Sequence, residues 1–560
     1  MLSLGISCNH DAGVTVLNGN QIVYAANEER FTRKKFDFGF PTHALAEALE
    51  FTNCERFDAI TFDGKRQTPH PSQVNLVFTE RTWMSQLAEL QVVAKPFFGT
   101  KVGVELSRLM LRCLTNRHRR HYLSRLTSMR ISGPVHYAEH HRAHAASAAM
   151  LFPSDSGLAI TVDAFGEGVC AGIWDVYNGR PHKRSVVPGY HSVGMLYLYV
   201  TNILGFKIGQ EGKVTGLAAH GDGSRVRDIL LSKIAFDAER NTFVNLSLGY
   251  GVRAINTLKS DLLEFSKEDI AAGAQAALEF LVLSYVRAAI LASGSANPHL
   301  FLAGGVFANV SLNRRIAEEL PVSSVAIAPN MGDGGLSLGA ALLNHDQRVE
   351  FSSLYLGSDV SRTLSRVPSE LLAQLSETRT PDLATAVADL LARGKIVAVA
   401  RDRMEFGPRA LGNRSILAPA TKSSVNDSLN KRLKRTEFMP FAPIVRDVDA
   451  EEYFNLRGPT WTYENMTITC LVKDRARREC PAIVHVDGTA RPQVLTEQRN
   501  PFIYEVLGQY KRLSGTAVLV NTSFNMHEEP IVRDAENAIR SFLAANLDAL
   551  ILAEHLFVKG

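Results

Sequence analysis

The feature that most constrains the fold of this chain is a pattern of strand and turn signals that occurs twice. Residues 4–26 carry apolar and β-branched strand signals, interrupted by a polar turn at 9–11 and an Asn-Gly turn at 18–20. An Asn-Gly pair between such segments is a strong hairpin signal. The same order returns over 158–179, with a small-residue turn at 164–168 and a second Asn-Gly pair. Two copies of one pattern predict two related lobes of an α/β domain.

A second domain is expected because the chain has 560 residues, more than one hydrophobic core usually serves. Residues 346–380 are dominated by Ser, Thr, Pro and charged residues, so we place a linker there. A helical pattern at 382–393 and a buried apolar strand at 394–400 then begin a new α/β segment. The predicted domains are therefore residues 1–345 and 381–560.

Composition favours a cytoplasmic protein that binds neither membranes nor nucleic acid. The net charge of +4 is too small to argue for a nucleic-acid partner. None of the six cysteines forms a Cys-x-x-Cys pair, which suits a reducing compartment. Residues 1–7 read as a first strand and not as a signal peptide. The most apolar helical stretch, 276–293, contains Glu279 and Arg287, so we expect a core helix and no membrane span.

One basic cluster stands out against this neutral background. It is either the solvated face of a helix or a patch for an acidic ligand or partner. Its members are Arg112, Arg117, His118, Arg119, Arg120, His121, Arg125 and Arg130.

Two histidines four residues apart, His140 and His144, lie in a run of good helix formers. On an α-helix this spacing puts both imidazoles on one face, about one turn apart. Such a pair can grip one metal ion, although capping, packing and surface decoration produce the same spacing. The pair makes the chain a candidate metal-assisted enzyme.

Two glycine-rich turns follow in the first domain. Residues 302–310 leave an apolar strand and open a helix, and such a turn lets backbone N–H groups approach a nucleotide closely. Residues 331–335 open a small-residue helix that runs through Ala341. Asp333 in this second turn stands where a metal ligand or a carboxylate of a phosphate site could project.

The second domain contains four polar segments of a related kind. Each alone reads as a charged surface loop, but four together favour a site for a polyanion, because Arg can meet two phosphate oxygens at once. The segments are 403–415 with three arginines, 431–435 with two basic pairs, 485–493, and 520–531.

Five sequence elements, spread over nearly the whole chain, together resemble the NodU/CmcH family of O-carbamoyltransferases. The last two elements are long and specific. The elements are Gly5-Ile6 with 10–12; 28–31 with Lys34-Lys35 and Phe40-Pro41; the His140/His144 helix; 405–415; and 521–525 with Glu529-Pro530.

This resemblance implies a two-domain enzyme. The N-terminal domain would have the actin/hexokinase-like (ASKHA) fold of the Kae type, and the C-terminal domain would be a YrdC-like α/β domain. The YrdC-like domain would make carbamoyl adenylate from carbamoyl phosphate and ATP with Mg²⁺. The Kae-like domain would then transfer the carbamoyl group to a hydroxyl of a small-molecule acceptor, and AMP would leave. Adenylation suits this chemistry because a carbamate is a poor electrophile without a good leaving group.

The resemblance also implies roles for residues of the first domain. His140, His144, Asp163 and Asp333 would hold a metal, with iron(II) expected and manganese or zinc compatible with the ligand set. His10 would act as the base for the acceptor hydroxyl, Asp11 would orient it or bind the acceptor, and Lys35 would neutralise the adenylate phosphate or polarise the carbamoyl oxygen. Phe36 stands where many relatives have histidine, which suggests a more apolar acceptor.

Nucleotide and donor sites are implied in the same way. The adenosine would be lined by Gly304, Gly305, Asn309 and Gly334, with Glu211 and Lys213 near the ribose and phosphate. ATP and carbamoyl phosphate would bind in the second domain to Arg409, Arg414, Lys434, Arg435, Arg491, Ser523 and Asn525.

Three alternatives remain open at this stage. Threonylcarbamoyl transfer to tRNA uses both domain types, but near-neutral charge and the lack of an RNA-stacking module argue against it. A kinase of the ASKHA fold would release ADP, and a non-catalytic regulator would bind nucleotide without turnover. The sequence does not name the acceptor, which could be an antibiotic, a sugar or a polyketide. We expect residues 36–130, with Trp83, Phe97 and Phe98, to govern its selection, and a homodimer is the assembly expected.

Overall fold

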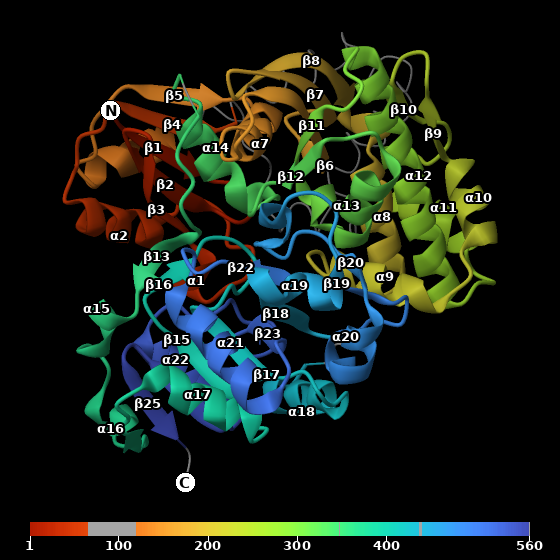
Figure 1. Cartoon of the computed structure of the whole chain (residues 1–560). Helices are drawn as coiled ribbons and strands as arrows, with labels where there is room; N and C mark the ends of the chain where they lie inside the picture. The colour runs from red at the N-terminus through yellow and green to blue at the C-terminus, as the bar shows by residue number, and fades with distance from the viewer. Residues whose placement is uncertain (65–118, 347, 436–438, 559–560) are drawn as a thin grey trace. The chain divides into compact units, whose positions relative to one another are not determined.

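The computed structural model describes an α/β protein (Figure 1). The residues that it describes are 1–64, 119–346, 348–435 and 439–558. They divide into two compact units, each discontinuous in sequence. Unit 1 comprises Met1–Val23 and Phe38–Phe351, and unit 2 comprises Tyr24–Asp37 and Ser352–Gly560.

Unit 1 is built on two five-stranded sheets. In the first sheet, β1 pairs antiparallel with β2 and parallel with β4, and β4 pairs parallel with β5. Its order is β3-β2-β1-β4-β5. The bounds are β1 (Leu2–Ser7), β2 (Gly13–Asn18), β3 (Gln21–Asn27), β4 (Ala59–Asp63) and β5 (Val135–Ala138).

The second sheet repeats this arrangement. Here β6 pairs antiparallel with β7 and parallel with β11, β7 pairs antiparallel with β8, and β11 pairs parallel with β12. Its order is β12-β11-β6-β7-β8. Read from β8 to β12, this is the order of the first sheet from β3 to β5, with each strand replaced by its counterpart. The bounds are β6 (Ser156–Gly166), β7 (Val169–Tyr177), β8 (Arg180–Pro188), β11 (His299–Ala303) and β12 (Ser324–Ile327).

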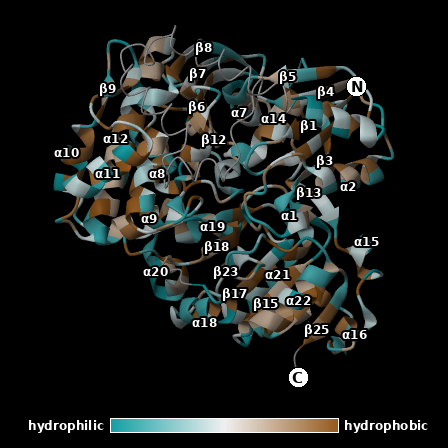
Figure 2. Cartoon of the chain, turned by 180° about the vertical axis from the view of Figure 1, so that it is seen from behind, coloured by the Kyte–Doolittle hydropathy of each residue, from teal (hydrophilic) through white to brown (hydrophobic). Residues whose placement is uncertain are grey.

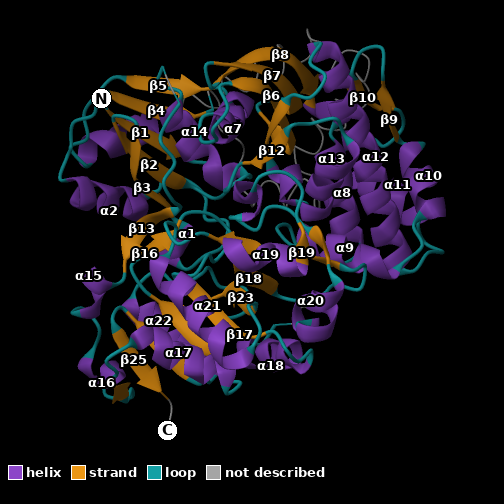
Figure 3. Ribbon diagram, viewed as in Figure 1, coloured by secondary structure: helices purple, strands orange, loops and turns teal. Residues whose placement is uncertain are grey.

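This duplicated sheet confirms the predicted α/β fold class and the prediction of two related lobes in the N-terminal part of the chain. Figure 3 shows the strands of both sheets with helices packed against them. One local prediction holds only in part. The turn expected over 164–168 is limited to residues 167–168, because β6 continues to Gly166, with a register shift between Val162 and Gly166. A bulge of this kind bends a strand and re-aims its side chains.

The helices of unit 1 include α14, which lies directly on β1 and α7. Two glycines permit this approach. A Cβ atom on Gly5 would lie 1.9 Å from the carbonyl oxygen of Ser337, and one on Gly339 would lie 1.9 Å from that of Ala143. The bounds are α2 (Thr42–Thr52), α7 (His140–Ala149), α8 (Val193–Ile203), α9 (Glu211–Leu217), α10 (Ser224–Leu231), α11 (Gly251–Asp261), α12 (Lys267–Ser293), α13 (Val310–Glu319) and α14 (Leu336–Leu342), beside the hairpin β9 (Ile234–Asp237) and β10 (Thr242–Asn245).

Helix α12 is the core helix expected from the apolar stretch at 276–293, and it begins nine residues earlier than that stretch. Ser266 caps its N-terminus, and Gly294 ends it in the left-handed conformation. It packs against α8, α9 and α10, and its Glu279 pairs with Arg315 at 2.6 Å. Within the described residues α12 alone is long and apolar enough to cross a membrane, but a partly buried core helix passes the same test.

Unit 2 contains an eight-stranded mixed sheet, a small sheet and a strand pair. The large sheet has the order β14-β25-β24-β15-β17-β23-β18-β22, the small sheet the order β19-β20-β21, and β13 pairs with β16. The bounds are β13 (Tyr355–Asp359), β14 (Glu377–Thr378), β15 (Val397–Ala400), β16 (Arg403–Glu405), β17 (Arg414–Pro419), β18 (Ala442–Arg446), β19 (Phe454–Asn455), β20 (Cys470–Val472), β21 (Thr489–Ala490), β22 (Gln493–Leu495), β23 (Leu519–Ser523), β24 (Ala549–Leu552) and β25 (His555–Val558).

The helices of unit 2 supply the apolar faces that cover this sheet. Side chains at alternate positions of β15, such as Val397 and Val399, form one buried cluster with residues of α17 and α21. In Figure 2 the helices carry apolar and polar residues side by side, as covering helices do. The bounds are α1 (Glu29–Thr32), α15 (Ser361–Leu364), α16 (Ser369–Leu372), α17 (Leu383–Ala392), α18 (Ser424–Leu433), α19 (Asp447–Tyr453), α20 (Asp474–Glu479), α21 (Pro501–Ser514) and α22 (Ala535–Ala545).

The segment expected to be a linker, 346–380, carries regular structure. Its strand β13 pairs with β16, and its strand β14 pairs with β25. Residues from Ser352 onward accordingly belong to unit 2. The functional domain bounds at 345 and 381 stay a prediction.

Candidate functional site

Helix α7 begins at His140 and carries both histidines of the predicted pair. Its sequence is rich in alanine, the best helix former. The Glu139 side chain makes no capping bond; instead the backbone N–H of His140 donates to Oε2 of Glu167, at 2.9 Å. Both imidazoles are buried, with His140 1% and His144 0% exposed. The helix is therefore held at its N-terminus by a carboxylate from the β6–β7 turn.

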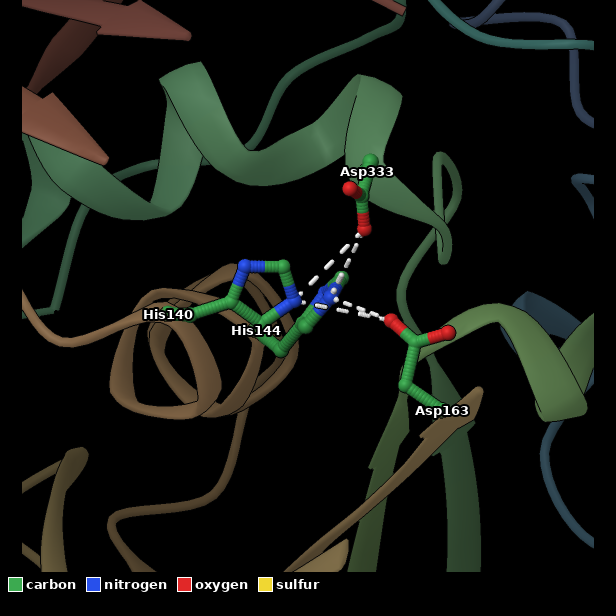
Figure 4. Close-up of side chains that lie close together, drawn as sticks. All are labelled: His140, His144, Asp163 and Asp333. Carbon is green, nitrogen blue, oxygen red and sulfur yellow. Dashed lines mark hydrogen bonds and ion pairs between the residues drawn. The ribbon is translucent and has the colours of Figure 1, made fainter. Parts of the chain in front are cut away.

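The four residues predicted to hold a metal meet in unit 1 (Figure 4). His140 and His144 come from α7, Asp163 from β6, and Asp333 from the turn before α14. Nε2 of His144 lies 3.2 Å from Oδ2 of Asp163 and 3.4 Å from Oδ1 of Asp333. The matching distances from Nε2 of His140 are 3.5 and 3.6 Å.

This donor set fits a metal ion. One ligand atom from each residue lies within 4.8 Å of every other, and all four side chains point to one place. Nε2 of His140 is buried and has no hydrogen-bond partner among the described residues. Buried polar atoms usually have partners, so this atom is placed for a ligand. Two imidazoles and two carboxylates suit iron, manganese or zinc.

The electrostatics of the group are dominated by its two carboxylates. Burial disfavours the charged form of His140, but Asp333 and Asp163 outweigh it and raise the pKa of His140 to about 9. Burial alone would raise the pKa of Asp163, yet both histidines hold it well below its usual range. The carboxylates therefore favour a positive charge at their centre, which a metal cation provides.

His141, the neighbour of the pair, has a different role. Its Nδ1 lies 2.9 Å from Oγ1 of Thr161, and its Nε2 lies 3.2 Å from the carbonyl oxygen of Val169. Burial and the charges of His140 and His144 lower its pKa to about 3, so it stays neutral. His141 therefore bonds to β6 and β7 and anchors the helix.

His10 and Asp11, predicted to be catalytic, lie in the turn after β1. Nδ1 of His10 is 3.2 Å from Oδ2 of Asp11, and its Nε2 is 3.2 Å from Oδ2 of Asp333. Burial would lower the pKa of His10, but Asp333 and Asp11 raise it to about 10. The imidazole is 51% exposed. His10 is thus bonded to the candidate metal group through Asp333 and is reachable from solvent.

Sequence reasoning missed two buried acids beside this group. Asp63 ends β4 and accepts hydrogen bonds from the N–H of Cys8 at 3.2 Å and from Nδ2 of Asn9 at 2.5 Å. Burial and the charge of Asp333 raise its pKa to about 7. Glu167, 7% exposed, adopts the left-handed conformation with φ of 54°. An acid at the end of an apolar strand could have marked Asp63, whereas no local pattern marks Glu167.

The glycines predicted to line the adenosine lie next to the metal ligands. Gly304 has φ of 104°, and a Cβ there would lie 2.2 Å from the carbonyl oxygen of Val162. A Cβ on Gly305 would lie 3.0 Å from Oδ1 of Asp163. Gly334 follows Asp333 directly. These turns therefore bring bare backbone to the edge of the candidate metal group.

The other residues predicted near the nucleotide are arranged differently. Asn309 caps α13 by accepting from the N–H of Leu312 at 3.1 Å, and its Nδ2 donates to Oε1 of Gln275 at 2.7 Å. Its side chain is thus engaged in a buried network. Glu211 and Lys213 lie on α9. Oε1 of Glu211 accepts from the N–H of Gly209, and burial raises the pKa of Glu211.

In unit 2 the structure brings together three of the predicted donor-site residues. The Arg435 guanidinium donates to Oδ1 of Asn525 at 2.6 Å and to Oγ of Ser523 at 3.1 Å. It also bonds to Oγ1 of Thr522 at 3.0 Å. Lys434 next to it ends α18 in the left-handed conformation and is exposed.

Arg409 and Arg491 form a second pair in unit 2. Burial lowers the pKa of Arg409 to about 10, and burial together with the charge of Arg409 lowers that of Arg491. Nε of each has no hydrogen-bond partner among the described residues. Two neighbouring guanidinia with unused donors are suited to an anion.

Arg414 differs from these arginines. It is fully buried, and its guanidinium donates to five backbone carbonyl oxygens, at 2.7 to 3.1 Å. The carbonyls belong to Ser358, Arg401, Asp402, Asn413 and Arg533. Arg414 therefore holds several backbone segments together. It does so although it lies in the same arginine-rich segment of the sequence, 403–415, as Arg409.

Two further predictions fall outside unit 1 or only partly within the described residues. Lys35 lies in the 24–37 segment of unit 2, beside Phe36, which is 38% exposed. In the basic cluster, Arg119 lies over the Tyr137 ring at 4.1 Å and Arg125 over the Phe40 ring at 5.9 Å. Three other members of the cluster, Arg112, Arg117 and His118, lie outside the described residues, as do the aromatic residues Trp83, Phe97 and Phe98.

Comparison with known proteins gives matches over both units. Residues 3–342 match the family model described as the carbamoyltransferase N-terminus, and residues 388–559 match the carbamoyltransferase C-terminus. An uncharacterized protein of Methanocaldococcus jannaschii is 32% identical over 99% of this chain and 99% of its own length. The 3'-hydroxymethylcephem-O-carbamoyltransferase of Streptomyces clavuligerus is 30% identical over 43% of this chain and 45% of that enzyme.

Among solved structures, HypF of T. kodakarensis covers 61% of this chain and 48% of its own. Its identity is 12% and its TM-score 0.32, a likeness too weak to carry an argument.

Proposed function

Because the chain belongs to the carbamoyltransferase family, we propose that this carbamoyltransferase is an ATP-dependent O-carbamoyltransferase that acts on a hydroxyl of a small molecule. The observation that carries the proposal is the buried group of two imidazoles and two carboxylates in unit 1. A kinase would need a phosphate site there, but it would not need a buried group of two imidazoles and two carboxylates. Carbamoyl transfer needs positive charge where the transferred group's oxygen becomes negative.

The first half-reaction is proposed for unit 2. Carbamoyl phosphate, ATP and water give carbamoyl adenylate, phosphate and pyrophosphate, with Mg²⁺ accompanying the ATP. Arg409 and Arg491 have unused donors for phosphate oxygens. Arg435 in the same unit hydrogen-bonds to Ser523 and Asn525, and we propose that these two side chains supply neutral hydrogen-bonding groups to the ligand. The YrdC-like character of this unit is part of the proposal.

The second half-reaction is proposed for unit 1. His140, His144, Asp163 and Asp333 would hold the metal, and we propose iron(II), with manganese or zinc as substitutes. Bound there, the cation would supply positive charge for the oxygen that becomes negative during transfer. His10 is the group proposed to receive the proton of the acceptor hydroxyl, because it is half exposed and is oriented by Asp11 and Asp333. The neutral imidazole that this role needs would form when a bound cation offsets the charge of Asp333, which raises the pKa of His10 to about 10 in the metal-free chain. Lys35, which belongs to unit 2, is proposed to neutralise the adenylate phosphate in that unit.

The acceptor is proposed to be a hydroxylated natural product or antibiotic. The Streptomyces relative carries the name of a cephem with a hydroxymethyl group, which is an acceptor of this chemical kind. We further propose a cytoplasmic enzyme, because the five cysteines among the described residues are all free thiols.

The deciding experiment is product analysis with the full chain, ATP, carbamoyl phosphate, Mg²⁺ and Fe²⁺, without acceptor. AMP and pyrophosphate that form only when carbamoyl phosphate is present would support the proposal. ADP as the product would support a kinase, and no turnover by folded protein would overturn both. Binding of tRNA at physiological salt would support threonylcarbamoyl transfer instead.

A pair of variants separates the two half-reactions. His144→Ala should abolish metal binding in unit 1 and acceptor carbamoylation, while carbamoyl-phosphate-dependent AMP formation persists. His182→Ala, which removes an exposed histidine of β8, is the matched control and should change neither. Loss of AMP formation in His144→Ala would contradict the assignment of the first half-reaction to unit 2.

A further inference from the structure

The segment 24–37 has an unusual place in the molecule. It comes from the N-terminal part of the sequence, between two stretches of unit 1, yet it belongs to unit 2. Its only helix, α1, has four residues and cannot be stable by propensity alone. Residues 24–27 complete β3, so the position of the residues after them, including α1, must come from contacts with the rest of unit 2.

Arg30 makes the most buried of these contacts. Only 2% of the residue is exposed, and its Nη2 donates to the carbonyl oxygen of Gly407 at 2.6 Å. Nη1 has no hydrogen-bond partner among the described residues. Burial lowers the pKa of Arg30, although the charges of Glu29 and Glu405 act against this. Burying a guanidinium here costs solvation free energy, whereas burying an apolar side chain would not.

The loop that Arg30 contacts carries Arg409 and is folded around Glu405. Oε1 of Glu405 accepts three backbone N–H groups, from Leu411 at 2.7 Å, Asn413 at 2.8 Å and Arg414 at 3.1 Å. These bonds fix the C-terminal half of the loop. The contact from Arg30 to Gly407 fixes the N-terminal half, two residues before Arg409.

Arg33 holds a second loop in the same way. Its Nη1 donates to the carbonyl oxygen of Ile531 at 2.7 Å, and its Nη2 to that of Pro530 at 2.6 Å. Arg533, just beyond, lies over the ring of Phe31 at 4.6 Å. This loop follows β23, which ends at Ser523, and Nδ2 of Asn525 bonds to the carbonyl oxygen of Glu529 within it.

We propose that Arg30 and Arg33 are positioning residues that shape the two anion-binding loops of unit 2, at 407–413 and 523–531. The segment 24–37 is thus a structural part of the site that binds the phosphate groups of carbamoyl phosphate and ATP. The identity of these ligands rests on the proposed function. The inference that an N-terminal arginine controls anion binding in unit 2 rests on the contacts themselves.

The test is the affinity of the full chain for carbamoyl phosphate and, separately, for Mg²⁺-ATP, measured by titration calorimetry. Arg30→Ala should weaken the binding of at least one of the two about 30-fold, the loss expected for one hydrogen bond from a charged donor. Added guanidinium ion should restore part of the affinity by occupying the vacated space. Arg393→Ala, which removes an exposed arginine of unit 2 that pairs with Asp389, is the control and should bind as the wild type does.

Arg33→Gln provides a milder second variant in case Arg30→Ala does not fold, because Arg33 is 24% exposed. We expect its binding to be weakened 3- to 10-fold, on the scale of a net hydrogen-bond contribution. Metal affinity of the His140/His144 group serves as an internal control and should not change in either variant.

The outcomes separate the two proposals. Unchanged affinity in folded Arg30→Ala and Arg33→Gln, or a loss that guanidinium does not relieve, would overturn the positioning role. A wild-type chain that binds carbamoyl phosphate but releases no AMP would overturn the proposed reaction and leave the binding comparison valid. A wild-type chain that binds neither ligand would overturn both.

Discussion

The backbone N–H of His140 donates to the carboxylate of Glu167 at 2.9 Å. His140 is therefore both a member of the candidate metal group and the residue at which α7 is capped. The cap comes from a different element, at the turn between β6 and β7. Orientation of both imidazoles therefore depends on a side chain that is not itself a ligand.

Replacement of Glu167 should weaken both the fold and the metal site. Glu167→Ala removes the cap and should lower the free energy of unfolding by about 1–2 kcal/mol and weaken metal binding about tenfold. Glu167→Gly removes the same cap but suits φ of 54°, so it should retain about 1 kcal/mol more stability than the alanine variant. Denaturant unfolding and metal titration measure these quantities. Equal stability of the two variants would contradict the backbone part of this explanation.

Gly166→Ala should disrupt the metal group directly. A Cβ at this position would lie 2.2 Å from Cδ2 and 2.5 Å from Nε2 of His140. The imidazole must move, and we expect a loss of metal affinity of at least tenfold, on the scale of altered ligand orientation. Gly212→Ala, where a Cβ meets nothing within 4 Å, is the control. Unchanged metal affinity in Gly166→Ala would show that His140 is not a ligand.

Asp63 should make the metal-free chain less stable as the pH rises. Its folded-state pKa of about 7 lies above the ordinary value of 3.8, because burial and the charges of Asp333 and Glu167 oppose ionisation more than His140 favours it. The folded chain therefore binds this proton more tightly than the unfolded chain does. The resulting stabilisation is complete below pH 3.8 and is lost as the pH rises through 7.

Between pH 5 and pH 8 this loss amounts to about 2.5 kcal/mol. Asp63→Asn lacks the titrating group, so its stability should fall less than that of the wild type over the same interval. Urea unfolding of both metal-free proteins at the two pH values tests this. A constant stability difference between them would show that Asp63 does not titrate in this range.

Arg409 and Arg414 should behave as opposites although they are five residues apart. Arg409→Ala should leave stability nearly unchanged and weaken the binding of carbamoyl phosphate or ATP at least tenfold, since it removes unused donors from the site. Arg414→Ala should lower the free energy of unfolding by about 3 kcal/mol or more, because five buried carbonyl contacts are lost. Thermal unfolding and calorimetry on both variants decide this. A folded Arg414→Ala with normal stability and lost binding would restore the role that its sequence position suggests.

The lobes of unit 1 could be predicted because the Asn-Gly hairpins and strand signals are local. The spacing of His140 and His144 likewise places two imidazoles on one helix face without knowledge of the fold. The bulge at the end of β6 could not be predicted, because the register shift between Val162 and Gly166 depends on the pairing with β7.

Residues whose roles depend on distant contacts were missed or misread. Arg30 bonds to a carbonyl 377 positions away, and nothing near Arg30 in the sequence indicates that partner. Arg414 and Arg409 look alike in sequence. Only the fold shows which of the two guanidinium groups is surrounded by backbone carbonyls. Asp163 and Asp333 were placed by family resemblance, not by spacing, and the structure brings them to the histidine pair.

Because residues 24–37 belong to unit 2, the gene cannot be divided between the two family regions without separating this segment from the rest of unit 2. A gene divided between the regions that encode 3–342 and 388–559 would yield a C-terminal product without Arg30 and Arg33. Its loops at Gly407 and Pro530 would lose the side chains that hold them. Physical separation of the two halves would therefore require the N-terminal product to deliver this short segment to its partner in trans.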